Sequence, residues 1–192
     1  MMIVMVSDSR SRMVESAVIL LAKHGLQATS FAEVLEHSGA PRGSIYHHFP
    51  EGKDQLIAAA ISLAGERAIA LLDGLDGSDA QDVVDGFSGM WRAVLRASDF
   101  GAGCSVLAVT VAADSPPLLA AAGEIFRGWR ERLAELLENG GITRATAPAL
   151  ATLIIASSEG AVVLSRAERS FAPFDQVGEQ LRVAVDAASR RG

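Results

Sequence analysis

The sequence predicts an all-α protein in which an N-terminal three-helix unit is followed by a larger helical body, with about nine helices in total. Three observations support this prediction. Apolar residues recur at helical spacing through most of the chain, no segment alternates apolar and polar residues as a half-buried strand does, and short breaks rich in glycine, proline and polar residues separate the helical stretches. The composition, 49% hydrophobic and 21% charged, is that of a globular protein.

The first helix is expected over residues 9–24. Its apolar residues fall on one face at the spacing of helical turns; they are Val14, Ala17, Val18 and Leu21. His24 lies in the last turn, where the helix dipole favours a basic side chain, and Gly25 ends the helix.

A second, short helix is expected from Phe31 to Ser38. Thr29 and Ser30 offer the N-cap, and Glu33, three residues after Ser30, completes a capping box. Gly39 then supplies the left-handed conformation that ends a helix at little cost.

The third helix is expected at about residues 42–48, opened by Pro41, which has no amide hydrogen to leave unsatisfied. Ile45 and Phe49 lie four residues apart and anchor one side of it. The polar residues of this stretch are left facing outward; they are Arg42, Ser44, His47 and His48.

From Lys53 onward the chain is predicted to be a series of amphipathic helices. The expected breaks are residues 74–78, 99–103, 114–117, 139–141 and the vicinity of Pro173. We therefore predict two domains, 1–52 and 53–192. Residues 1–53 hold five basic and five acidic residues, so the whole net charge of −6 belongs to residues 54–192.

A short helix, a glycine turn and a second helix with an outward polar face are typical of a helix-turn-helix, whose second helix enters the major groove of DNA. Arginine, histidine, tyrosine and lysine side chains are concentrated on and just after that helix. Such groups hold phosphate oxygens or donate to base edges. The pattern therefore favours double-stranded DNA as a partner.

The run "ATSFAEVLEHSGAPRGSIYHHF" makes this interpretation specific. Residues of about 9–56 resemble the DNA-binding domain of the TetR family of bacterial transcriptional regulators (TetR/AcrR type). In the body, "GCSVLAV", "FRGW" and "SSEGAVVLSRAERS" are similar to an LmrA-like branch of that family.

The resemblance implies roles for individual side chains. Thr29 or Ser30, Tyr46 and Lys53 would contact phosphates. Arg42, Ser44 and His47 would approach bases. Gly43 would let the backbone come close to the groove. His48 would face DNA or cap the end of the helix. Three residues separate Phe49 from Lys53 where the family usually has two, so Lys53 would reach its phosphate at a different angle.

Aromatic and other apolar residues of the central body helices have two interpretations that stay open. They form the core, or some of them line the effector cavity that the resemblance implies; the candidates are Phe87, Met90, Trp91, Cys104, Phe126 and Trp129. As the single cysteine, Cys104 cannot form an internal disulfide, which fits a cytoplasmic protein, and it is expected to act as a small apolar residue rather than as a redox sensor.

A stripe in the eighth helix is predicted to form a homodimer interface together with the last helix; it contains Leu150, Leu153, Ile154, Ser157, Ala161 and Leu164. A two-fold operator requires a two-fold protein. The competing interpretation is a helix packed only within its own subunit.

Several classes of protein are excluded or disfavoured. The chain contains no phosphate-binding glycine loop, dinucleotide fingerprint, nucleophile elbow or zinc-binding His pair, so we expect neither an enzyme nor a cofactor. No metal site is expected at the histidines. The longest stretches without a charged residue are 14 residues long, so we expect no membrane span. The resemblance implies a homodimeric repressor released from a palindromic operator by a small hydrophobic effector; the alternative is a helical ligand-binding dimer that does not bind DNA.

Overall fold

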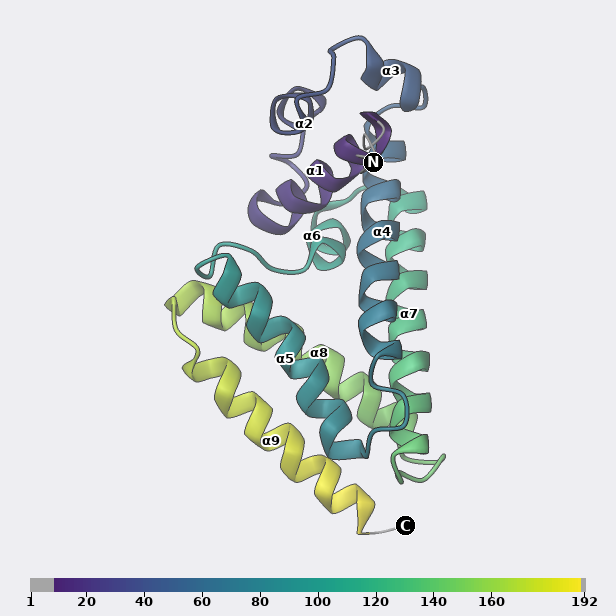
Figure 1. The fold of residues 1–192 in the computed structure, drawn as a ribbon, viewed down its shortest axis with the longest axis vertical. Helices are drawn as coiled ribbons and strands as arrows, with labels where there is room; N and C mark the ends of the chain where they lie inside the picture. The colour runs from purple at the N-terminus through teal and green to yellow at the C-terminus, as the bar shows by residue number, and fades with distance from the viewer. Residues whose placement is uncertain (1–8, 191–192) are drawn as a thin grey trace, which may run out of the picture. The chain divides into compact units, whose positions relative to one another are not determined.

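The computed structural model describes residues 9–190, and every regular element within them is an α-helix, as the sequence predicts (Figure 1). The helices of this range are α1 (Ser9–His24), α2 (Phe31–Ser38), α3 (Ser44–His48), α4 (Lys53–Asp73), α5 (Ala80–Ala97), α6 (Ser105–Ala112), α7 (Pro116–Asn139), α8 (Ala147–Glu168) and α9 (Ala172–Ser189).

The chain forms two compact units. Of the described residues, the first unit contains residues 9–64 together with Ser105–Gly123, and the second contains Gly65–Cys104 and residues 124–190. Helices α4 and α7 each begin in the first unit and end in the second. The first unit includes α6 in addition to the N-terminal helices. The predicted domains, 1–52 and 53–192, divide the chain at one point in its linear order, and this boundary stays a prediction.

In the first unit, α1 packs against α2, α3 and α6. Of the apolar face expected for α1, Val14, Ala17 and Leu21 are buried and Val18 is half-buried. The completely buried residues around it come from several helices; they include Met13, Leu21, Val34, Ile45, Phe49 and Ile57. Phe49 is therefore a core residue. We call α1, α2, α3 and their connections the head.

The ends of α2 confirm the predicted capping pattern. The Ser30 hydroxyl accepts from the Glu33 amide at 3.2 Å, and the Ser30 amide donates to the Glu33 carboxylate at 3.2 Å, which together make a capping box. Gly39 has φ 62° and ends the helix in the left-handed region, where a glycine carries no Cβ penalty.

The start predicted for α3 is wrong by two residues, since the helix begins at Ser44 and not at Arg42. Pro41 opens a turn instead, in which the Ser44 amide donates to the Pro41 carbonyl at 2.9 Å. The segment between the two helices is therefore longer than the expected three residues. The consequence is that Arg42 and Gly43 lie on a turn before the helix.

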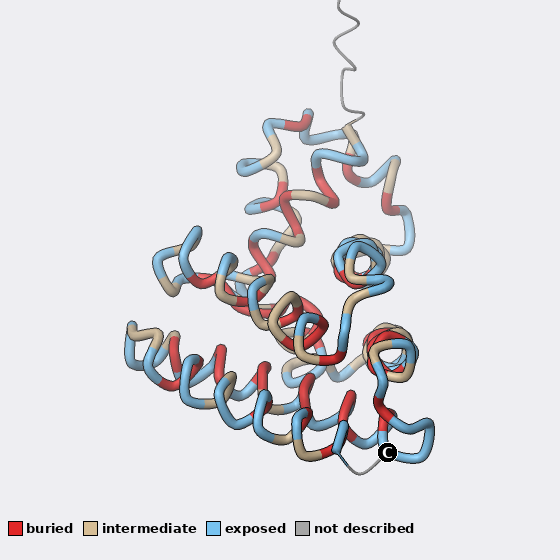
Figure 2. Tube along the Cα trace, turned by 60° about the horizontal axis from the view of Figure 1, so that its bottom comes forward, coloured by how far each residue is buried: buried red, intermediate tan, exposed pale blue. Residues whose placement is uncertain are grey.

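In the second unit, α5, α8 and α9 pack against one another (Figure 1). Buried positions recur on one side of each helix, which is visible in Figure 2 as red segments alternating with pale blue ones. Within α7, Trp129, Leu133 and Leu137 are buried as their spacing predicts. The indole Nε1 of Trp129 donates to the Gly65 carbonyl of α4 at 3.2 Å.

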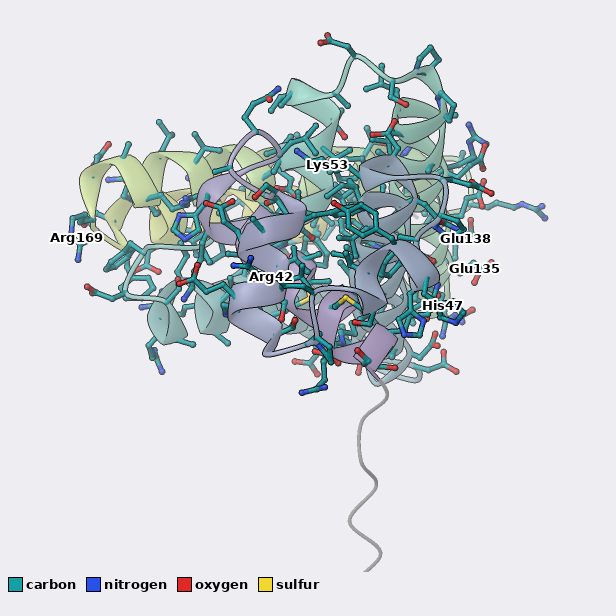
Figure 3. The ribbon with its side chains drawn as sticks, turned by 90° about the horizontal axis from the view of Figure 1, so that it is seen from above. Arg42, His47, Lys53, Glu135, Glu138 and Arg169 are labelled. Atoms are coloured by element: carbon teal, nitrogen blue, oxygen red, sulfur yellow. The ribbon has the colours of Figure 1, made fainter. Side chains whose placement is uncertain are left out.

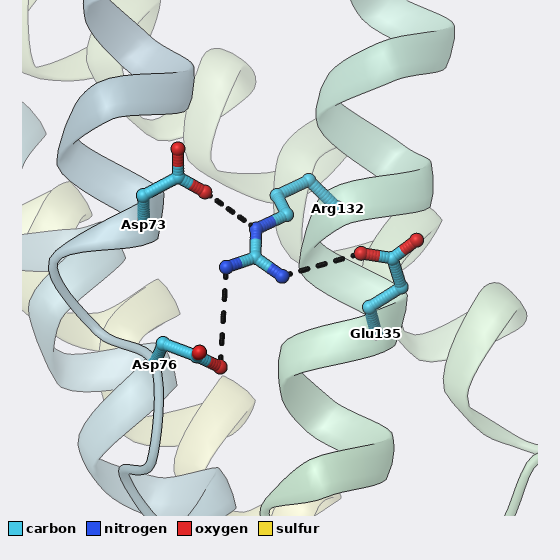
Figure 4. A network of polar contacts seen from close by, with 4 residues as sticks. All are labelled: Asp73, Asp76, Arg132 and Glu135. Carbon is cyan, nitrogen blue, oxygen red and sulfur yellow. Dashed lines mark hydrogen bonds and ion pairs between the residues drawn. The ribbon is translucent and has the colours of Figure 1, made fainter.

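An arginine of α7 holds the C-terminal end of α4 and the loop that follows it (Figure 4). Arg132 Nε donates to Asp73 at 2.7 Å, and the same guanidinium contacts Glu135 at 3.2 Å and Asp76 at 3.9 Å. The hydrogen bond to Asp73 raises the pKa of Arg132, with further contributions from Glu135 and Asp76, and burial opposes this. The network fixes the chain where it turns toward α5.

Two helices, α4 and α8, are long and apolar enough to cross a membrane, with mean hydropathy of 1.5 and 1.7 over their most apolar windows. The sequence analysis expected no membrane span because it measured only stretches without a charged residue. Both helices contain charged residues in their middle, such as Glu66 in α4 and Glu159 in α8, and therefore failed that criterion. Parts of both windows are buried, 39% in α4 and 50% in α8, by packing within the protein. We therefore interpret α4 and α8 as helices that pack within the protein and not as membrane spans.

Candidate nucleic-acid interface

The candidate interface is formed by α3 and the turn that precedes it. Ile45 and Phe49 are completely buried and fix the helix to the head, which leaves Arg42 and His47 exposed (Figure 3). The His47 and His48 rings meet edge to face, with centroids 5.3 Å apart. Burying one side of so short a helix leaves Tyr46 and His47 exposed on the other, while Ser44 and His48 are half-buried.

Tyr46 is 69% exposed, and its ring is packed while its hydroxyl can face outward. Its ring packs edge to face on the Phe31 ring of α2, with centroids 5.7 Å apart, and this contact orients the side chain. A groove of about 570 Å³ lies at this place, and its walls are formed by Phe31, Ala32, Leu35, Glu36, Ala40, Arg42 and Tyr46. The α2 side of this groove was not among the predicted site residues.

Ser44 and Gly43 lie at the start of α3. The Ser44 hydroxyl donates to the Pro41 carbonyl at 2.6 Å and lies 3.3 Å from the Ser9 hydroxyl of α1. Gly43 is exposed, and a Cβ built on it would meet no atom within 4 Å. In this structure the Ser44 hydroxyl is thus held within the head, and the backbone at Gly43 is open to approach.

The two hydroxyl residues before α2 differ in their surroundings. Thr29 is 1% exposed, and its hydroxyl donates to the Gly25 carbonyl at 2.8 Å. Ser30 is half-buried, and its side chain belongs to the capping box. Of the two, Ser30 is therefore the residue that is reachable from outside.

Lys53 is half-buried at the first position of α4, and its Nζ donates to the Leu26 carbonyl at 2.8 Å. The extra residue between Phe49 and Lys53 fits into a tight turn, in which Gly52 has φ 94° and its amide donates to the Phe49 carbonyl at 3.1 Å. The lysine at the start of α4 is thus held to the loop after α1.

Among residues 9–190, no group of three or more histidine, cysteine, aspartate and glutamate side chains is arranged to hold a metal ion. His37, from α2, is occupied elsewhere, with its Nδ1 3.0 Å from the Ser16 hydroxyl of α1. The exposed side chains of the head offer hydrogen-bond donors and a positive charge, for which phosphates and base edges are suitable partners.

Comparison with known proteins decides the family. Residues 14–60 match the family described as "Bacterial regulatory proteins, tetR family", and residues 80–180 match "Transcriptional regulator LmrA/YxaF-like, C-terminal domain". The chain belongs to the TetR family. Its second match agrees with the LmrA-like branch that the body motifs predict, so the chain is a DNA-binding transcriptional regulator by family and is not an enzyme.

Relatives cover nearly the whole chain. An HTH-type transcriptional regulator of Mycobacterium tuberculosis is 38% identical over 90% of this chain and 92% of its own length. YxaF of Bacillus subtilis is 30% identical over 93% of this chain and 95% of its own. Among solved structures, a TetR transcriptional regulator from Legionella pneumophila superposes with a TM-score of 0.83 at 24% identity, over 94% of this chain and 98% of that one.

The six residues predicted for an effector site all lie in the second unit of this TetR protein. Four of them are buried, namely Phe87, Trp91, Cys104 and Trp129, and two are half-buried, namely Met90 and Phe126. Phe126 and Trp129 meet edge to face at 5.3 Å. A pocket of about 750 Å³ between α5 and α9 is lined by other residues, among them Asp85, Arg92 and Phe174.

A further residue of this TetR body escaped the sequence analysis. Glu159 is 7% exposed, and burial raises its pKa to about 7, opposed by the neighbouring Cys104 thiol. Its sequence signal is a single acidic residue within the apolar run "ATLIIASSEGAVVL". A charged residue inside such a run is rarely buried without a partner or a function.

Proposed function

We propose that this TetR-family protein is a homodimeric repressor that binds a palindromic operator and is released from it by a small hydrophobic effector. Repression is the commoner mode of action in this family. Transcription factors of bacteria act where the DNA is, so the protein works in the cytoplasm.

The observation that carries the DNA-binding proposal is the exposed polar side of α3, held in place by the buried Ile45 and Phe49. Arg42 and His47 would approach base edges, together with Ser44 once its hydroxyl leaves the Pro41 carbonyl. Tyr46, Lys53 and Ser30 would contact phosphates, and Thr29 would support them from inside the head. Gly43 would let the backbone approach the groove, and His48, half-buried beside His47, would contact DNA or cap α3.

Dimer formation is supported by an exposed apolar face on α8 and α9. Leu153, Val163, Leu164 and Val183 are all about half exposed, from 47% to 57%. Ala156 and Gly160 are exposed between them on α8 and would allow close approach of a partner helix. Leu150, Ile154 and Ala161, which belong to the predicted stripe, are buried within the subunit instead. The proposed interface is therefore the outer face of α8, turned away from that core, with Val183 of α9.

Operator release requires an effector that prefers one of two conformers, since a ligand shifts an equilibrium only by its differential affinity. Helix α4 begins at Lys53 in the first unit and ends at Asp73 in the second, so it is a direct covalent route for such a shift. The candidate effector residues are the six placed in the second unit above.

The test is a pair of variants measured on operator fragments selected from genomic DNA. Arg42→Ala removes a base contact and Tyr46→Phe removes one hydroxyl while keeping the Phe31 contact, so each should weaken operator binding by roughly tenfold or more. Arg144→Ala, an exposed arginine in the second unit, is the matched control and should leave affinity unchanged. Unchanged affinity in a folded Arg42→Ala, Tyr46→Phe double variant would leave a ligand-binding dimer without DNA binding as the better account.

A further inference from the structure

Three side chains of the second unit carry polar atoms that are buried and have no hydrogen-bond partner. They are the indole Nε1 of Trp91, both carboxylate oxygens of Glu159 and the hydroxyl of Ser165. Trp91 is on α5 and the other two are on α8, and these two helices pack against each other. Buried polar groups are nearly always hydrogen-bonded, so an unpaired group signals a missing partner.

Glu159 is the most demanding of the three, because a carboxylate offers about four acceptor sites and carries a full charge. The thiol of Cys104 lies beside it, and a thiol is a weak donor that brings no positive charge. Burial is the dominant influence on this carboxyl group and keeps its pKa near 7. An ionised Glu159 therefore lacks a counter-charge in the protein as it stands.

Three arginines of α8 and of the helices that pack against it have partners other than Glu159. Arg166, seven residues further along α8, donates to the Gly101 carbonyl at 3.3 Å. On the two helices that pack against α8, Arg92 pairs with Asp175 and Arg182 pairs with Asp85. None of these charges contributes to the pKa of Glu159, whose shift comes from burial and from Cys104.

We propose that the Glu159 carboxylate is the polar anchor of the effector site, and that the effector is an apolar molecule carrying a protonated amine. An ammonium group supplies both missing elements at once, a positive charge and hydrogen-bond donors, and charge-assisted hydrogen bonds are the strong ones. A neutral effector would leave the charge uncompensated. The unpaired donors of Trp91 and Ser165 suit acceptor atoms on the same class of molecule.

This inference rests on the proposed function, because it names the chemical class of the effector. It is tested without DNA, so that a failure of operator binding and a failure of amine binding are separate results. The probes are benzylamine, 1-naphthylmethylamine and 9-anthracenylmethylamine, each compared with the corresponding alcohol. Amine and alcohol have the same shape and differ in charge.

Calorimetry on the full chain at pH 8 should show that at least one amine binds roughly tenfold or more tightly than its alcohol. Glu159→Gln should abolish that preference while the alcohol binds as before. The matched control is Glu168→Gln, which makes the same chemical change at an exposed position of α8 and should preserve the preference.

A second measurement needs no variant and therefore does not depend on whether Glu159→Gln folds. Between pH 6 and pH 8 the Glu159 carboxyl group passes from mostly protonated to mostly ionised, so the affinity of the wild type for the amine should rise by roughly tenfold, whereas that for the alcohol stays constant. Absence of amine binding at pH 8, equal binding of amine and alcohol, a preference that survives in Glu159→Gln, or amine affinity independent of pH would each overturn the proposal.

Discussion

The Nζ atom of Lys53 donates a hydrogen bond to the backbone carbonyl of Leu26, at 2.8 Å. Leu26 follows the end of α1 and Lys53 begins α4, so this bond ties the start of α4 to the connection between α1 and α2. An ammonium group has three donors, and it can keep this carbonyl while donating to a phosphate. Under the proposed function, Lys53 would stabilise the head and bind a phosphate of the operator with the same atom.

Lys53→Met should affect both properties. Loss of the bond to Leu26 should lower the free energy of unfolding by about 1 kcal/mol, because a part-buried carbonyl loses its donor. Loss of a phosphate contact should reduce the slope of log affinity against log salt by about 0.9. Urea unfolding and operator binding at several salt concentrations measure the two effects. If the salt slope stays the same, Lys53 has a structural role only.

Leu164→Glu should convert the protein from a dimer to a monomer. The side chain is 51% exposed on the outer face of α8, where a buried charge at a subunit interface would lack a partner. Sedimentation equilibrium measures the change. Val111→Glu, at a residue of α6 that is 74% exposed, is the control and should leave the dimer intact. A Leu164→Glu protein that remains dimeric would place the interface elsewhere.

Gly140→Ala should destabilise the second unit. A Cβ at Gly140 would lie 2.6 Å from the amide nitrogen of Ala80 and 2.9 Å from the carbonyl carbon of Asp79, and backbone atoms cannot move aside as a flexible side chain can. We expect a loss of roughly 1–3 kcal/mol. Gly128→Ala, within α7 and with no atom in reach of its Cβ, should instead gain about 0.5–1 kcal/mol. Thermal unfolding of the two variants should show shifts of opposite sign.

Glu159→Gln should make the ligand-free protein more stable at high pH. The folded-state pKa, about 7, is above the unfolded value of 4.5, so folding favours the protonated acid and the wild type loses stability as the pH rises through this range. The variant cannot ionise there, and it should exceed the wild type by up to about 3 kcal/mol at pH 8 and by less than about 1 kcal/mol at pH 5. Urea unfolding at both pH values measures the difference. A constant difference would mean that the carboxyl group is already compensated.

Much of the fold could be predicted from the sequence because its signals are local. The Ser30 and Glu33 capping box depends on residues three apart, and the left-handed Gly39 depends on one residue's lack of a Cβ. The start of α3 was predicted less well, because Pro41 suits both the first position of a helix and a turn. The hydrogen bond from the Ser44 amide to the Pro41 carbonyl decides for the turn.

The residue types of the candidate site could be predicted from the sequence, but the contacts of their side chains could not. The polar composition of α3 could be recognised from residue types, whereas the burial of Thr29 and the bond from Lys53 to Leu26 depend on segments far apart in the chain. Glu159 shows the same limit. Its place in an apolar run is visible in the sequence, but the burial of its carboxylate away from any counter-charge depends on how segments far apart in the chain pack on α8.

The most direct test of the account is selection of genomic fragments by the purified protein, followed by sequencing, with the Arg42→Ala protein in parallel. We predict one palindromic motif enriched by the wild type, with half-site centres roughly one or more whole turns of DNA apart, and its loss with Arg42→Ala. No enriched motif from a folded, dimeric wild type, or the same motif from both proteins, would contradict the assignment of α3 and its turn as the reading element.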